Sequence, residues 1–130
     1  MRQIVYISTA APDLGRDDVS QVLDASARNN PGCGITGFLV YNGQNFLQLI
    51  EGPEESLSNL MAELARDPRH SGIVRLEDHA IGQRACSDWV MKSLVLTDDI
   101  ARREANLAKL LPAGIDQQIR RTILNFAALN

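Results

Sequence analysis

Short β-type runs of apolar residues alternate along the first part of the chain with segments that have helical spacing. Five segments rich in β-branched, aromatic and aliphatic residues predict strands: residues 3–8, 35–41, 45–50, 73–81 and 89–95. The second and third runs flank Asn42-Gly43, and two such runs around Asn-Gly are a strong signal for a β-hairpin. The pattern therefore predicts one strand before a hairpin and two further strands after it.

Two segments between these strands place apolar residues three and four positions apart, which predicts amphipathic helices. The first covers residues 16–29 and ends before Asn30-Pro31, and the second covers residues 54–66 directly after Pro53. The resulting order is β-α-β-β-α-β-β. It favours an α+β fold, a ferredoxin-like sandwich with both helices on one face of a sheet.

Residues 98–130 differ from the rest because they show two further helical patterns and no strand pattern. Their apolar positions form two stripes: Ile100, Leu107, Leu110 and Leu111, then Ile115, Ile119, Ile123 and Phe126. These stripes must be covered, either by the free face of the sheet or by another subunit. We therefore expect one domain over residues 1–97 and a helical extension over 98–130 within the same unit. A homodimer is favoured because the stripes need cover.

Composition narrows the classes of function. A chain of 130 residues fits one domain, and its net charge of −3 with no block of Lys or Arg argues against nucleic-acid binding. Apolar runs are too short to cross a membrane. Cys33 and Cys86 match no disulfide or zinc spacing, so a cytoplasmic location is expected.

One motif is misleading. Gly32, Gly34 and Gly37 match the G-x-G-x-x-G fingerprint of dinucleotide-binding folds. That motif requires a strand before it and a helix after it, whereas here a helix precedes and a strand follows. The glycines are instead expected to serve the helix-to-strand turn and close backbone packing.

Polar side chains occur at positions that the apolar pattern places in the core. Tyr6 and Gln48 interrupt two apolar strands, and Ser26 and Asn30 continue the apolar stripe of the first helix. Buried polar groups need hydrogen-bond partners, so each of these side chains could bond to nearby backbone. Alternatively, the four side chains could converge on a bound polar ring system. An amide suits such a ring because it offers both a donor and an acceptor. No nucleophile with a nearby base is evident.

These residues carry a family resemblance. Residues 2–97 resemble a BLUF domain, a flavin-binding sensor of blue light, of the short stand-alone type. The resemblance rests on an ordered set of segments: Ile4-Val-Tyr6-Ile-Ser8, Ser26-x-x-Asn29-Asn30-Pro, Gly34-Ile-Thr-Gly37, Phe46-Leu-Gln48-x-Ile-Glu51-Gly52, Asp67-Pro-Arg69-His70 and Trp89-Val-Met91. It implies FAD bound between the two helices on one sheet face, with FMN or riboflavin as substitutes.

The resemblance also implies roles for individual residues. Tyr6 matches the tyrosine that gives an electron and a proton to photoexcited flavin, and Gln48 matches the glutamine whose hydrogen bonds then switch. Trp89 and Met91 match a last-strand pair whose position relative to the flavin changes on illumination. The implied flavin-binding set is Ser26, Asn29, Asn30, Gln48, Asp67, Arg69 and His70.

The expected function is thus a photoreceptor without enzymatic activity. Its red-shifted signalling state would be read by a downstream protein partner, whose identity the sequence does not indicate. Two alternatives stay open at this point. One is an acylphosphatase-type hydrolase, which shares the order of elements but needs a phosphate-binding loop. The other is an interaction module that uses its helical tail and binds no chromophore.

Overall fold

A computed structural model describes residues 1–13, 21, 34–86, 92–95 and 100–128 of the chain. The elements follow in the order β1 (Arg2–Ala10), β2 (Thr36–Tyr41), β3 (Asn45–Gly52), α2 (Glu54–Arg66), β4 (His70–Ala80), β5 (Lys92–Val95), α3 (Ile100–Leu110) and α4 (Gln117–Ala128). The helix predicted over residues 16–29 lies outside the described residues, apart from position 21.

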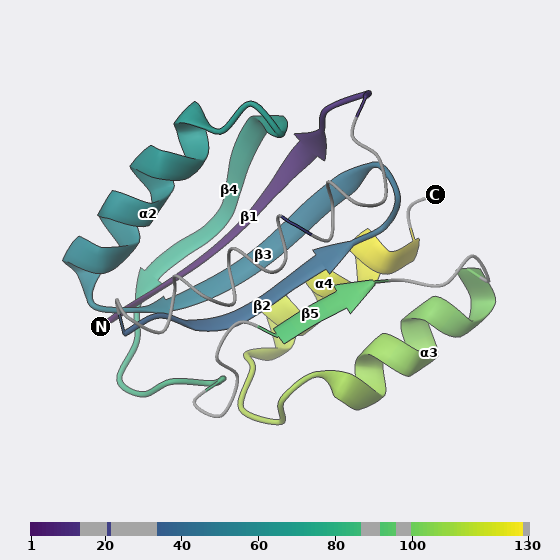
Figure 1. Ribbon diagram of the computed structural model, residues 1–130. Coiled ribbons are helices and arrows are strands. Elements are labelled where there is room, and N and C mark those ends of the chain that lie inside the picture. Colours follow the sequence, from purple (N-terminus) through teal and green to yellow (C-terminus); the bar gives the residue numbers. More distant parts are fainter. Residues whose placement is uncertain (14–20, 22–33, 87–91, 96–99, 129–130) are drawn as a thin grey trace.

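The strands form one sheet in the order β4-β1-β3-β2-β5 (Figure 1). β1 pairs antiparallel with β3 and β4, and β2 pairs antiparallel with β3, whereas β2 and β5 run parallel. This arrangement confirms the predicted ferredoxin-like fold and places the last predicted strand, β5, at one edge beside β2. It also places β1 and β3 in the middle, so their side chains are covered on both faces.

Neighbouring residues of the central strands point to opposite faces, and each face has its own apolar core. The first core packs under α2 and contains Ile4, Tyr6, Ile35, Leu39, Phe46, Ile50, Leu57 and Met61. The second contains Val5, Phe38, Val40, Leu47, Leu49, Cys86, Leu107, Leu111, Ile115, Ile119, Ile123, Phe126 and Ala127. Figure 1 shows α2 and α4 on opposite sides of the sheet.

The second core shows what covers the apolar residues of the C-terminal helices. Residues of α3 and α4 bury their apolar side chains on the free sheet face of the same chain. The need for cover, which was the reason for favouring a homodimer, is therefore met within one chain. One assignment in the stripe is wrong: Leu110 is 44% exposed, because it lies on the outer side of α3 whereas Leu107 faces the sheet.

The glycine assignment is confirmed at two positions. Gly34 has a φ of 71° in the turn before β2, a conformation that favours glycine. Gly37 has a φ of 145°, and a Cβ atom there would lie 1.9 Å from the carbonyl oxygen of Leu49. Gly37 therefore allows β2 to approach β3 closely. Gly32 lies outside the described residues.

β4 begins three residues earlier than the sequence predicts. It starts at His70, and Ala10 and Thr9 of β1 pair with His70 and Ser71. Gly72 has a φ of 64°, and the pairing register shifts in this region. A glycine at such an irregularity breaks the apolar alternation, which is why the sequence pattern begins only after it.

Candidate functional site

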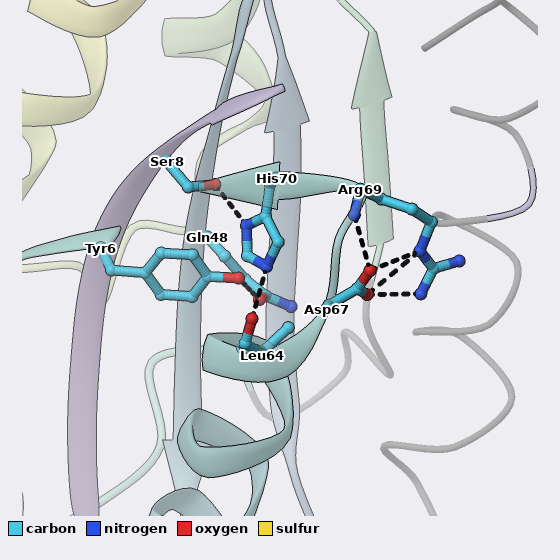
Figure 2. A network of polar contacts seen from close by, with 7 residues as sticks. All are labelled: Tyr6, Ser8, Gln48, Leu64, Asp67, Arg69 and His70. Atoms are coloured by element: carbon cyan, nitrogen blue, oxygen red, sulfur yellow. Dashed lines mark hydrogen bonds and ion pairs between the residues drawn. The ribbon is translucent and has the colours of Figure 1, made fainter. Parts of the chain in front are cut away.

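Tyr6 and Gln48 face each other across the centre of the sheet. They are directly opposite in the pairing of β1 with β3, and both side chains point to the α2 face. The phenolic hydroxyl of Tyr6 donates a hydrogen bond to Oε1 of Gln48 (Figure 2). Each residue is only 2% exposed. The fold therefore holds a phenol and an amide side chain in contact, away from solvent.

The surroundings of Tyr6 keep its hydroxyl protonated. Burial raises the pKa of Tyr6 well above its ordinary value of 10.0, because the charged phenolate would lose its hydration. The negative charge of Asp67 raises the pKa further. At neutral pH the group is a neutral hydrogen-bond donor.

His70 connects three elements around this pair. Its Nε2 lies 2.8 Å from the carbonyl oxygen of Leu64 in the last turn of α2, and its Nδ1 lies 2.7 Å from Oγ of Ser8 in β1. A carbonyl oxygen can only accept, so Nε2 carries a proton and donates to Leu64. Nδ1 and the Ser8 hydroxyl form the second hydrogen bond of the ring. Both nitrogens are engaged within the protein, so His70 can offer a ligand mainly its ring face.

Asp67 and Arg69 form an ion pair at the end of α2. The Nε and Nη2 atoms of Arg69 lie 2.9 and 2.6 Å from the two Asp67 oxygens, and the backbone N–H of Arg69 donates at 2.9 Å. The side-chain hydrogen bond from Arg69 is the main reason that the pKa of Asp67 is lowered. The Arg69 side chain is 39% exposed, so this pair lies toward solvent while Tyr6 lies at depth.

A hollow lies between α2 and the sheet beside these residues. Its lining combines apolar and polar side chains: Tyr6, Leu39, Phe46, Gln48, Leu64, Asp67, Arg69 and His70. The apolar members suit the flat faces of a flavin ring, and the Gln48 amide suits its polar edge. Arg69 at the rim suits a phosphate or ribityl hydroxyl group. The donor set of this structure thus fits a flavin.

The structure brings together part of the predicted site. One hollow is lined by residues from β1, β3, the segment after α2 and the start of β4: Tyr6, Gln48, Asp67, Arg69 and His70. Five other predicted positions lie outside the described residues: Ser26, Asn29, Asn30, Trp89 and Met91.

Sequence reasoning missed residues that complete the site. Ser8 was treated only as part of a strand, yet it bonds to His70. Alternation provides a signal for it, because positions 6 and 8 of a strand share one face. The backbone carbonyl of Leu64 also bonds to His70, and such a backbone role has no signal in the sequence.

Other kinds of site find no support in the described part of the chain. Among those residues no three His, Cys, Asp or Glu side chains gather as a metal-binding group. No described helix is both long and apolar enough to pass through a membrane.

Comparisons with known proteins agree with this site. Residues 1–92 match the family model BLUF, "Sensors of blue-light using FAD". Photoactivated adenylate cyclase subunit beta of Euglena longa is 34% identical over 91 residues, which are 69% of this chain and 11% of that protein. The blue light- and temperature-regulated antirepressor BluF of Escherichia coli K12 is 34% identical over 73 residues, 56% of this chain and 18% of that protein. The chain thus spans only a small part of these relatives.

Solved structures share the fold over nearly the whole chain. BlrB, a BLUF protein in its dark state, has a TM-score of 0.75 at 30% identity, covering 96% of both chains. Klebsiella pneumoniae BlrP1 with FMN and cyclic diGMP has a TM-score of 0.84 at 28% identity, covering 98% of this chain and 34% of that one. By the family match and by the site that the fold builds, this chain belongs to the BLUF family of blue-light sensors that use FAD.

Proposed function

We propose that this chain detects blue light through FAD held against Tyr6 and Gln48, with Tyr6 as electron and proton donor and Gln48 as the hydrogen-bond switch. The observation that carries this proposal is the buried hydrogen bond from the Tyr6 hydroxyl to Gln48 Oε1. The bound flavin supplies light absorption and, once excited, a strong one-electron oxidant. The chain supplies the electron and proton donor and the amide whose hydrogen bonds change.

Tyr6 can give up an electron only if its proton also leaves, because a charged phenol radical cation is unfavourable in a buried site. The hydrogen bond to Gln48 gives that proton a defined acceptor, the Oε1 atom of the amide. Gln48 is not redox-active, but its amide has a donor end and an acceptor end. Rotation or tautomerisation changes which end meets Tyr6 and which meets the flavin, so the light event is stored as a new hydrogen-bond pattern.

The direct test is illumination of the purified protein. We expect a yellow protein whose flavin absorption bands shift reversibly to longer wavelength under blue light and return in the dark. A colourless protein, or a yellow one whose bands do not move, would contradict the proposal. Chromatography of the released chromophore identifies the cofactor. We expect FAD, with FMN or riboflavin able to take its place because most of the described lining residues suit the ring that all three share.

We further propose that the signal passes to another protein and that the sensor itself catalyses no reaction. The names of the relatives support this, since an adenylate cyclase subunit and an antirepressor attach the same kind of sensor to different outputs. A pull-down with this chain as bait, performed in the dark and under blue light, should capture a partner in one state preferentially. A cytoplasmic location and a homodimer stay predictions. Fractionation and light scattering would check them.

A further inference from the structure

Glu51 is a buried acid for which the proposed photochemistry has no use. It lies in β3, three positions after Gln48, and is 0% exposed. Its side chain points to the opposite face of the sheet from Gln48, because odd-numbered positions of β3 face the tail helices. A buried carboxylate is costly to keep unless hydrogen-bond donors surround it, so its partners show what it is for.

Four donors surround the Glu51 carboxylate. The backbone N–H groups of Ala85 and Cys86 donate to its oxygens at 3.0 and 2.5 Å. Side chains from neighbouring strands add two more bonds, from Thr36 Oγ1 at 3.2 Å and from Gln3 Nε2 at 3.3 Å. Glu51 therefore ties three strand segments to residues 85–86, which follow β4 in the chain.

Arg84 adds hydrogen bonds between the same segment and the strands. Its Nη1 donates to Thr36 Oγ1 at 2.8 Å and to the Glu51 carbonyl oxygen at 3.0 Å, and its Nη2 donates to the Gly34 carbonyl oxygen at 2.7 Å. The Thr36 hydroxyl accepts from Arg84 and donates to Glu51, so the polarities are consistent. We call Glu51, Thr36, Arg84 and the backbone N–H groups of Ala85 and Cys86 the Glu51 clamp.

The Glu51 clamp adjoins the tail helices. Cys86 is 1% exposed and belongs to the core that α3 and α4 complete. The neighbouring residue Ala85 packs beside Gly114, which lies in the connection between α3 and α4. A Cβ atom on Gly114 would lie 3.8 Å from the Cα atom of Ala85. Any movement of the Glu51 backbone must carry residues 85–86 with it, since otherwise two buried amides lose their acceptor.

We propose that Glu51 is a positioning residue that couples the strand carrying Gln48 to the α3–α4 layer. It transmits a light-driven rearrangement on one face of the sheet to the helices on the other. This inference rests on the proposed function. It requires that β3 backbone movement at Gln48 reach Glu51, which is three residues along the same strand.

The test compares light-dependent amide hydrogen exchange in α3 and α4 between full-length flavin-loaded variants. Glu51→Gln retains the side-chain shape but replaces one acceptor oxygen with a donor, so one of the two backbone amides loses its partner. Thr36→Val is milder, because it breaks the relay from Arg84 and leaves both backbone bonds. Glu104→Gln is the control, since it removes the same charge from an exposed position of α3.

We expect blue light to change exchange in α3 and α4 of the wild type and of E104Q. In E51Q that change should be lost, and in T36V it should be reduced, while the flavin band shift persists in both. An equal exchange response in E51Q, or none in the wild type despite a band shift, would overturn the inference. If E51Q does not retain flavin, the same comparison is made with T36V. A reduced exchange response with an unchanged band shift then supports the inference, and an equal exchange response overturns it. Absence of a band shift in the wild type would instead contradict the proposed function.

Discussion

Tyr6 combines two properties that a photochemical donor needs. It is buried, and its hydroxyl has a defined partner in Gln48. Replacing Tyr6 with Phe removes only that hydroxyl, so we expect the flavin to stay bound and the light-induced band shift to disappear. Absorption spectra before and after illumination measure both. Gln48→Leu should likewise abolish the shift. Tyr41→Phe should leave it intact, because the Tyr41 hydroxyl bonds to the Gly43 carbonyl oxygen at the hairpin and not to Gln48. A shift that survives in Y6F would contradict the assignment.

The raised pKa of Tyr6 has a consequence for stability at alkaline pH. In the unfolded chain Tyr6 ionises near 10.0, whereas in the folded protein burial keeps it protonated to higher pH. The unfolded state therefore loses a proton first, and stability falls as pH rises above 10.0. The slope for this one group is about 1.4 kcal/mol per pH unit. Urea unfolding at several pH values measures the free energy of unfolding of wild type and Y6F, and the difference between the two should show this slope above pH 10.0. A difference that does not change with pH would contradict the prediction.

At the scale of elements, His70 fixes the end of α2 against β1. Replacing it with Phe keeps the ring near Phe46, with which it makes an edge contact at 6.4 Å, but removes both hydrogen bonds. The Ser8 hydroxyl and the Leu64 carbonyl then lose their partner. We expect the free energy of unfolding to fall by about 2 kcal/mol. Urea denaturation measures this loss. Ser8→Ala, which removes one bond, should cost less than H70F, and an unchanged midpoint in both would contradict the role of His70.

How much the sequence predicts also differs by element. The bounds of α2 agree with its apolar spacing and the preceding Pro53, because local signals determine them. Tyr6 and Gln48 were predicted because a polar residue in an apolar strand stands out. Glu51 was not given a role, since its charge is typical of a surface and its partners at positions 85–86 come from distant sequence. The bonds of His70 likewise depend on tertiary packing, which spacing does not encode.

At the scale of the whole molecule, the tail helices are part of the core. Leu107 and Leu110 lie three residues apart in α3, but Leu107 is 2% exposed and Leu110 is 44% exposed. Leu107→Ala should therefore lower the free energy of unfolding by about 2–5 kcal/mol. Leu110→Ala in the same helix should change it by less than about 1 kcal/mol. Urea unfolding of the two variants provides a matched comparison, and similar losses would show that α3 does not pack on the sheet as described.

The alternation of side chains along β3 divides the molecule into two compartments that share one backbone. Even-numbered positions, from Phe46 to Ile50, face α2 and the hollow beside it, and odd-numbered ones, from Leu47 to Glu51, face the core that α3 and α4 complete. A substitution at an odd position therefore changes the packing against the tail helices and leaves the side chains that line the hollow in place, whereas one at an even position changes that lining directly. A single strand of eight residues thus offers separate positions at which the lining of the hollow and the packing of the tail helices can be varied by substitution.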